Sequence, residues 1–293
     1  MYIAEYPNQI ASLLHKILEK NGPDREDYQQ VFSFIEQMEA SEIEAFREAM
    51  QPILNPGTII GFSFTKPFGY NGDFFIIEKI YQHYVSSDPR YKKWDEFFHT
   101  FPAAIAVVNR KKLAIDVLKG LISKSSEKQG DILILGSGPV TEVYEFLKEH
   151  PQSQLQFDLI DLDKRAIDYA KVKNKIFLAK MEFFNCNIIR FTPAKTYDLI
   201  WSAGLFDYFK DKHFVYLLKK YYEYLNPGGE MIIGNFGNGN PSRKIMEILG
   251  DWFLVHRSTD ELIGFALQAG IPASKIEVDS EPLGINLFLR IRK

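Results

Sequence analysis

The chain has 293 residues, 46% of them hydrophobic, which is enough apolar material for one large or two ordinary domains. Its net charge is −3 with both signs mixed along the chain, so no basic tail for nucleic acid is indicated. One cysteine excludes an intrachain disulfide, no apolar run is long enough to span a membrane, and the first residues lack a secretory signal. We therefore expect a cytoplasmic protein.

The first part of the chain, up to about residue 125, has helical spacing. Apolar stripes predict helices over residues 10–18, 28–38, 74–85 and 101–121. Ser41 with Glu44 fits a capping box for a further short helix, and Gly120 is expected to end the last one.

The stretch from Gly61 to Phe74, GFSFTKPFGYNGDF, is rich in glycine and aromatic residues and predicts a structured loop. Two hypotheses concern its polar residues. Tyr70 and Asp73 would belong to a lid that closes a ligand pocket and excludes water, or Asp73 would simply cap the helix that starts at Phe74. The two hypotheses are compatible.

The polar stretch 123–130 separates two predicted domains, a helical cap or substrate domain over 1–125 and a second domain over 126–293. In the second, strands and helices alternate, which predicts a mostly parallel sheet with helices on both faces. Strands are expected near 131–135, 156–161, 181–185, 197–201 and 230–234, followed by a final strand pair at 275–278 and 286–291.

The second domain opens on DILILGSGPV, in which a buried strand runs into Gly136-Ser137-Gly138-Pro139 and then into a helix. Glycines here allow a tight turn and a close approach to a ligand, and Pro139 suits the first turn of the helix. The next strand ends in Asp161-Leu162-Asp163, about 20 residues later, where an acid can bind the ribose hydroxyls of a nucleotide. Together the two features predict a site for a nucleotide-type cofactor.

Six segments together resemble the class I S-adenosylmethionine-dependent methyltransferases. These are LGSGP, DLD, NCN at 185–187, YDLIWSAG at 197–204, NPGG at 226–229 and the terminal strand pair. The resemblance implies a Rossmann-like fold with a seven-stranded, mostly parallel sheet, an antiparallel terminal strand and S-adenosyl-L-methionine as cofactor. One departure is Ile134, where many members carry an acid.

The same resemblance assigns roles to cofactor-binding residues. The glycine loop, Gly136 to Pro139, would lie against the methionine part, and Asp161 with Leu162 would bind the ribose side. Cys186 and Asn187 would meet the adenine, and the loop after the fourth strand, Ser202, Ala203 and Gly204, would face the methyl group.

A narrower resemblance rests on GYNGDF at 69–74, the pair Asn109-Arg110, SAGLFDYF at 202–209 and the run from Gly234 to Arg257. These segments are similar to a bacterial family that includes methyltransferases forming the methyl ester of a 3-hydroxy fatty acid such as 3-hydroxypalmitic acid. The resemblance implies a small or lipid-like acid as methyl acceptor.

A carboxylate acceptor is ionised near neutral pH and needs no general base. Arg243 and Arg257 are candidates to bind such a carboxylate, although Arg243 is also placed to pair with Glu247 one turn on. Asp207 would face the methyl group or fix the loop after the fourth strand. With Tyr70 and Asp73, these residues form the predicted catalytic set.

Other functions remain open at this point. A nicotinamide-dependent oxidoreductase would need a third glycine where Thr141 stands. Another small-molecule oxygen or nitrogen acceptor and a non-catalytic cofactor-binding protein are further alternatives. No metal, nucleic acid or membrane span is expected, and a homodimer is left open.

Overall fold

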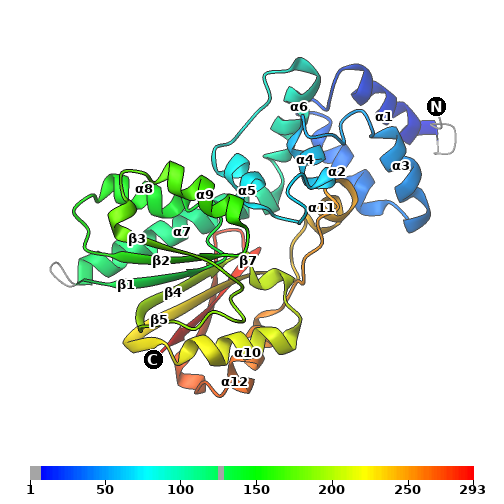
Figure 1. Cartoon of the computed structure of the whole chain (residues 1–293). Helices are drawn as coiled ribbons and strands as arrows, with labels where there is room; N and C mark the ends of the chain where they lie inside the picture. The colour runs from blue at the N-terminus through cyan, green and yellow to red at the C-terminus, as the bar shows by residue number, and fades with distance from the viewer. Residues whose placement is uncertain (1–7, 125–128) are drawn as a thin grey trace. The chain divides into compact units, whose positions relative to one another are not determined.

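The computed structural model describes residues 8–124 and 129–293, which form two compact units (Figure 1). The helical unit comprises the described residues up to Ile105 together with Asn240–Phe253. The sheet unit comprises the described residues of Ala106–Gly239 and Leu254–Lys293. The division thus falls inside α7 (Pro102–Lys124) rather than near residue 125, where the sequence predicted the boundary.

The helical unit is built mainly from the first part of the chain. Its helices are α1 (Asn8–Glu19), α2 (Tyr28–Gln37), α3 (Ile43–Ala49), α4 (Ile59–Thr65), α5 (Phe74–Tyr81), α6 (Pro89–Phe98), the start of α7, and α11 (Arg243–Leu249). Helix α11 comes from far along the chain and is tied in by Arg47, whose guanidinium donates to the carbonyl oxygens of Glu247 and Ile248 at 2.9 and 2.8 Å. The sequence did not predict that Asn240–Phe253 would return to this unit.

Local features of the helical unit correct three sequence predictions. The stretch 61–74 is not one loop, because α4 runs to Thr65; Gly61 is needed there because a Cβ would lie 2.1 Å from the carbonyl oxygen of Asn55. The capping box before α3 is formed by Glu39 and Glu42, which close a 3-10 turn, and not by Ser41 and Glu44. Gly120 lies inside α7 and does not end it.

The sheet unit contains a seven-stranded sheet in the order β3-β2-β1-β4-β5-β7-β6. Its strands are β1 (Asp131–Leu135), β2 (Gln156–Asp161), β3 (Met181–Asn185), β4 (Tyr197–Ala203), β5 (Leu225–Phe236), β6 (Ile276–Ser280) and β7 (Asn286–Arg292). The first five pair in parallel, and β7 is antiparallel to both β5 and β6. This is the predicted sheet.

The NPGG segment, Asn226–Gly229, is not a separate turn before the fifth strand. These residues lie within β5, which begins at Leu225. The pairing of β5 with β4 shifts register between Tyr197 and Leu199, and Gly228 has a φ of +81°, so the segment is a bulged start of the strand.

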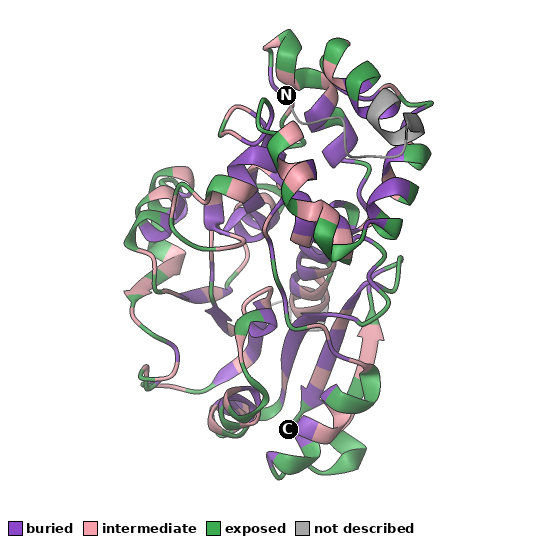
Figure 2. Ribbon diagram, turned by 90° about the vertical axis from the view of Figure 1, so that its right-hand side faces the viewer, coloured by how far each residue is buried: buried purple, intermediate pink, exposed green. Residues whose placement is uncertain are grey.

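Helices cover both faces of the sheet (Figure 1). Ile132 and Ile134 of β1 pack with residues of α7 and α8 (Thr141–Glu149), whereas Leu133 and Leu135 pack with α10 (Asp211–Tyr222) and α12 (Thr259–Gln268). Because successive side chains of a strand point to opposite faces, a continuous apolar run is the sequence signature of a strand buried on both sides. Figure 2 shows the central strands in the colour of buried residues.

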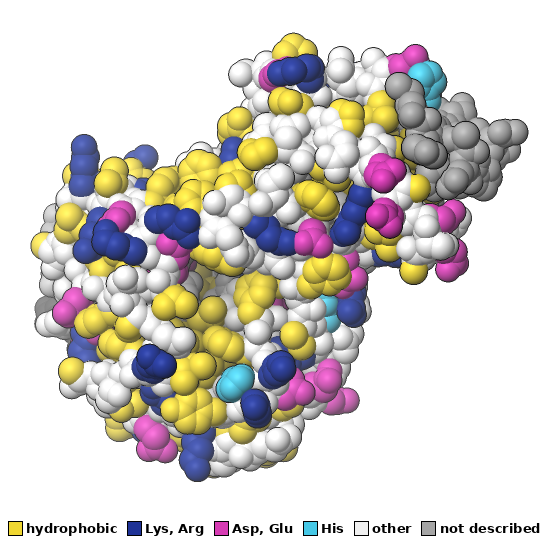
Figure 3. Space-filling view, turned by 45° about the vertical axis from the view of Figure 1, so that its right-hand side comes forward, with side chains coloured by type: hydrophobic (Ala, Val, Ile, Leu, Met, Phe, Trp, Pro, Cys, Tyr) yellow, Lys and Arg dark blue, Asp and Glu magenta, His cyan; other side chains and the backbone are white. Residues whose placement is uncertain are grey.

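The carboxyl ends of β1, β2, β3 and β4 meet at one edge of the sheet, because these strands are parallel. In open sheets of this kind the ligand site lies at that edge. Elsewhere, none of the helices described is both long and apolar enough to cross a membrane. On the face drawn in Figure 3, basic and acidic side chains are intermixed.

Candidate functional site

The glycine loop leaves β1 in a conformation that favours glycine. Gly136 and Gly138 have φ of +67° and +54°, and Val140, the N-cap of α8, has φ of +56°. Two of the loop's amides are tied to the end of β2. The N–H of Ser137 donates to the carbonyl oxygen of Ile160, and the N–H of Gly138 donates to Oδ2 of Asp161, both at 2.9 Å. The loop is therefore fixed across two neighbouring strand ends.

Asp161 is the organising residue of this edge. Its Oδ1 accepts from the N–H of Asp163 at 2.9 Å, while Oδ2 holds Gly138. Burial raises the pKa of its carboxyl, and the N–H donors of Asp163 and Gly138 oppose that rise. Since each carboxylate oxygen has two lone pairs, both can still accept a ligand hydroxyl.

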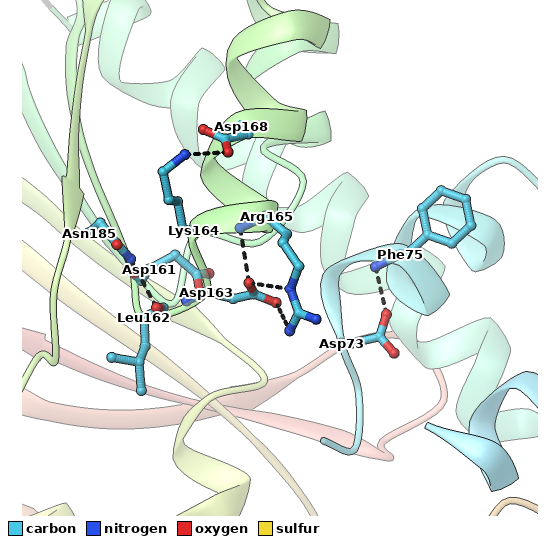
Figure 4. Close-up of polar contacts among 9 residues, drawn as sticks. All are labelled: Asp73, Phe75, Asp161, Leu162, Asp163, Lys164, Arg165, Asp168 and Asn185. Atoms are coloured by element: carbon cyan, nitrogen blue, oxygen red, sulfur yellow. Dashed lines mark hydrogen bonds and ion pairs between the residues drawn. The ribbon is translucent and has the colours of Figure 1, made fainter. Parts of the chain in front are cut away.

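The turn after β2 is fixed by its own polar residues (Figure 4). Asp163 caps α9 (Lys164–Lys173) by accepting from the N–H of Arg165 at 2.9 Å. Asn185, at the end of β3, donates to the carbonyl oxygens of Asp161 and Leu162 at 3.1 and 2.9 Å. Leu162 itself is 69% exposed, so this turn presents an apolar side chain to its surroundings.

The loop after β3 is organised by one backbone hydrogen bond and one side-chain hydrogen bond. The N–H of Cys186 donates to the carbonyl oxygen of Asp161 at 3.2 Å, and Oδ1 of Asn187 accepts from the N–H of Ile189 at 2.8 Å. Burial raises the pKa of the Cys186 thiol. Both residues therefore lie at the same sheet edge as Asp161, where the sequence predicted them.

The loop after β4 packs against the glycine loop. A Cβ on Gly136 would lie 2.9 Å from Cδ2 of Leu205, so only glycine allows this contact. Ser202 is buried and donates from Oγ to the carbonyl oxygen of Leu135 at 2.8 Å. Gly204 follows Ala203 with a φ of +113°. Ser202 thus fixes β4 to the end of β1.

Ser137 provides a test of whether this edge fits a polar ligand. The residue is 4% exposed, and its Oγ has no hydrogen-bond partner among the described residues. A buried hydroxyl without a partner is costly unless a ligand or water satisfies it. The space on the Cβ side of Gly138 is open, since no described atom lies within 4 Å of that position. The residues of this edge therefore fit a nucleotide-type cofactor.

Two predicted catalytic residues, Asp207 and Arg257, lie in the sheet unit, and both form hydrogen bonds with other residues of that unit. Asp207 is buried and accepts from the N–H of Phe236 at 2.7 Å, and burial raises the pKa of its carboxyl to about 6. Asp207 therefore fixes the turn after β4 to the end of β5, which was one of its two predicted roles.

Arg257 is buried at the centre of a network. Its guanidinium donates to the carbonyl oxygens of Phe206 and Phe209, to Oδ1 of Asn235 at 2.7 Å and to Oδ1 of Asp211 at 2.9 Å. Four acceptors within the protein give this guanidinium a structural role. That Arg257 binds the substrate carboxylate stays a prediction.

The remaining predicted residues lie in the helical unit. Asp73 caps α5 by accepting from the N–H groups of Phe75 and Ile76 at 2.8 and 3.0 Å, which confirms the capping hypothesis (Figure 4). Arg243 is exposed and pairs with Glu247 at 2.8 Å, as its spacing predicted. Tyr70 lies in the turn between α4 and α5 and is 38% exposed. The lid hypothesis for Tyr70 and Asp73 stays a prediction.

One buried charged residue near the site was not predicted as functional. Arg110 lies on α7, and its guanidinium lies beside Gly204. Its position on the helix could have identified it as a candidate. Val107, Arg110 and Ala114 fall on one helical face, and all three are buried. A charge on an otherwise apolar stripe is unusual and marks a candidate.

Comparison with known proteins agrees with this geometry. Residues 132–229 match the family model described as "Methyltransferase domain". The malonyl-[acyl-carrier protein] O-methyltransferase 1 of Ilyobacter polytropus is 31% identical over 113 residues, which are 39% of this chain and 40% of that protein. The chain spans about half or less of the length of the curated relatives it matches.

Two solved structures share the fold. A protein from Bordetella parapertussis is 15% identical, with a TM-score of 0.69 and coverage of 99% of each chain. The magnesium protoporphyrin IX methyltransferase of Synechocystis PCC 6803, solved with bound S-adenosylhomocysteine, is 10% identical with a TM-score of 0.51, covering 64% of this chain and 84% of that one. The matched methyltransferase domain lies within the sheet unit, and the seven-stranded sheet of that unit is the fold of class I S-adenosylmethionine-dependent methyltransferases.

Proposed function

We propose that the sheet unit binds S-adenosyl-L-methionine along the carboxyl edge of β1 to β4 and methylates the carboxylate of a small or lipid-like acid. The observation that carries the cofactor part is the link from the N–H of Gly138 to Oδ2 of Asp161, with the unpartnered Oγ of Ser137 beside it in the sequence. This link joins the loop expected at the methionine part to the acid expected at the ribose.

The cofactor supplies an activated methyl group on a sulfonium, and the protein supplies alignment and a dry site. Asp161 would accept from the ribose hydroxyls through its remaining lone pairs. Leu162, Cys186 and Asn187 would surround the adenine, and the glycine loop would lie along the methionine part. Each of these residues is fixed by hydrogen bonds within the protein before a ligand arrives. Such preorganisation lowers the cost of binding.

The acceptor part is supported by chemistry and by one relative. A carboxylate is its own nucleophile, so the enzyme would need no general base. In the sheet unit, Asp207 is engaged by the N–H of Phe236, and His256 has Nδ1 at 3.2 Å from the carbonyl oxygen of Leu254. Neither arrangement is that of a dedicated base. The relative from Ilyobacter polytropus carries the name of an O-methyltransferase acting on malonyl-[acyl-carrier protein].

The test is transfer of a labelled methyl group from S-adenosylmethionine to a panel of acceptors. The panel contains 3-hydroxy fatty acids, shorter carboxylic acids, and the matching alcohols and amines. We expect a product from the acids only, and we expect mild alkali to release the label as methanol, because methyl esters hydrolyse whereas methyl ethers and N-methyl groups do not. An alkali-stable product from the alcohols or amines would move the proposal to another acceptor. Cofactor binding without any product would favour a non-catalytic protein.

A further inference from the structure

Arg110 is a buried cation that the proposed function does not yet use. It lies on α7 within the sheet unit and is 5% exposed. Removing a guanidinium from water is costly, so such a group is normally paired. The contacts of Arg110 therefore indicate what the site is built to receive.

The guanidinium of Arg110 lies against the loop after β4. A Cβ on Gly204 would be 2.7 Å from Nη1, and 3.0 Å from both Cζ and Nη2. Every other residue type would displace the arginine, and the φ of +113° at Gly204 also excludes most side chains. Gly204 thus lets the guanidinium approach the backbone of this loop.

Arg110 lacks the partners that a structural arginine has. Its Nε is buried without a hydrogen-bond partner, and no ion pair among the described residues includes it. Nε of Arg257, in the same unit, is also buried without a partner, but the Nη1 and Nη2 atoms of Arg257 have four acceptors. Arg110 is therefore free to bind an anion.

The charge of Arg110 acts on two buried acids, and two lysines act on one of these acids as well. Glu142, in the first turn of α8, is 8% exposed; burial raises the pKa of its carboxyl, whereas Arg110, Lys173 and Lys111 lower it. Arg110 likewise lowers the pKa of the Asp207 carboxyl, which burial raises. The two lysines are already engaged, Lys111 by Glu145 at 2.6 Å and Lys173 by Oγ1 of Thr141 at 2.6 Å. An anion that also brought a positive charge would suit this setting, because it would add no net charge beside Glu142.

The order of strands places Arg110 at one end of the proposed cofactor site. Asp161 follows β2, the glycine loop follows β1 and Gly204 follows β4, so the ribose acid and the arginine stand two strands apart, about 10 Å. The amino-acid end of S-adenosylmethionine is a zwitterion at the far end from the adenine. We infer that Arg110 binds the α-carboxylate of that amino-acid end, an inference that rests on the proposed function.

The test compares two ligands that differ by the amino-acid end. S-adenosylhomocysteine carries it, and 5′-methylthioadenosine lacks it. Calorimetric titration is made with wild type, Arg110→Met, Arg110→Lys and the control Arg292→Met, which removes an exposed arginine of β7. For Arg110→Met we expect a loss of about 10- to 100-fold in affinity for S-adenosylhomocysteine and a change of less than about twofold for 5′-methylthioadenosine. Arg110→Lys keeps the charge but not the planar guanidinium, so it should lose less affinity for S-adenosylhomocysteine and again little for 5′-methylthioadenosine. Arg292→Met should change neither affinity.

The outcomes distinguish a failure of this inference from a failure of the proposed function. Failure of the wild type to bind S-adenosylhomocysteine would overturn the proposed function and the inference together. Wild-type binding with equal losses for both ligands, or with no loss in Arg110→Met, overturns the inference alone. If Arg110→Met does not fold, as judged by circular dichroism, Arg110→Lys decides in the same way.

Discussion

The N–H of Gly138 donates to Oδ2 of Asp161 at 2.9 Å, which joins the loop after β1 to the end of β2. Oδ1 of the same carboxylate accepts from Asp163, so one side chain holds two turns. The glycine loop and the acid, which are separate features of the sequence, thus form one structural unit at the sheet edge. A ligand at this edge meets groups that are already fixed.

Replacing Asp161 by asparagine should weaken cofactor binding. Both carboxylate oxygens accept from N–H groups, so an asparagine must turn its own NH₂ toward one of these donors. We expect a loss of about 10- to 100-fold in affinity for S-adenosylhomocysteine, measured by calorimetry. The control is Asp168→Asn on α9, an exposed partner of Lys164, which should leave the affinity unchanged. Equal affinities for wild type and Asp161→Asn would argue against this site.

Replacing Ser137 by alanine should separate binding from stability. The Oγ of Ser137 is buried and unpartnered, so its removal should leave the melting temperature of the ligand-free protein unchanged or higher. Affinity for S-adenosylhomocysteine should fall by about 2- to 10-fold. The control Ser202→Ala removes a hydroxyl that donates to Leu135 and should cost about 1–3 kcal/mol of stability. A destabilised Ser137→Ala variant with normal affinity would contradict a ligand role.

Asp207 should make stability depend on pH in the acidic range. Its carboxyl has a pKa of about 6 in the folded protein against 3.8 as the ordinary value, so the folded state binds more protons between these two values. The contribution of this group to the free energy of unfolding is therefore present below pH ~4 and is lost as pH rises through about 6. Asp207→Asn keeps an acceptor for the N–H of Phe236 but cannot titrate.

The measurement for Asp207 is urea unfolding of both proteins from pH 4 to 8. The free energy of unfolding of wild type relative to Asp207→Asn should fall by about 3 kcal/mol at most over this range. Parallel curves for the two proteins would show that Asp207 does not titrate in the folded state in this window.

Gly204 should tolerate no side chain. Gly204→Ala combines an unfavourable φ of +113° with a Cβ only 2.7 Å from Nη1 of Arg110, and we expect a loss of about 1–3 kcal/mol. Gly264→Ala is the matched control, because Gly264 lies within α12 with open space around its Cβ position. That control should be stabilised by about 0.5–1 kcal/mol. Thermal unfolding of the two variants gives the comparison, and similar effects on both would contradict the close approach of Arg110.

Arg257 and Arg243 should differ in what they support. Arg257→Met breaks a buried network with Asn235, Asp211 and two carbonyl oxygens, and should cost about 2–4 kcal/mol of stability. Arg243→Met removes an exposed pair with Glu247 and should change stability by less than about 0.5 kcal/mol. Activity of the folded Arg243→Met variant then tests whether Arg243 binds the acceptor. A stable Arg257→Met protein would overturn the structural role given to Arg257.

The sheet could be predicted closely from the sequence because its strands are buried on both faces. The bounds of β1, β2 and β3 coincide with the predicted ranges, since their apolar runs are bounded by glycines, acids and polar turns. Helix α4 (Ile59–Thr65) was missed because Gly61 is needed for a close approach to Asn55, which is a tertiary contact and not a turn signal. The return of Asn240–Phe253 to the helical unit has no local signature at all.

The site was partly predictable for the same reason. The positions of Gly138, Asp161 and Cys186 follow from where parallel strands end, a property that sequence pattern reveals. The partners of a charged side chain are not revealed in this way. Arg257 was expected to be available, but its Nη1 and Nη2 are engaged by two carbonyl oxygens and two side chains, whereas Arg110 has no ion pair among the described residues. Only the three-dimensional contacts distinguish the two.

The most direct test of the central claim is calorimetric titration of the wild-type chain with S-adenosylmethionine, S-adenosylhomocysteine and NADH. Our account predicts saturable binding of the first two at one site, binding weakened by about 10- to 100-fold in Asp161→Asn, and no binding of NADH. Binding of NADH alone, or of none of the three by the folded protein, would contradict the assignment of the edge formed by Gly138 and Asp161 as a site for S-adenosylmethionine.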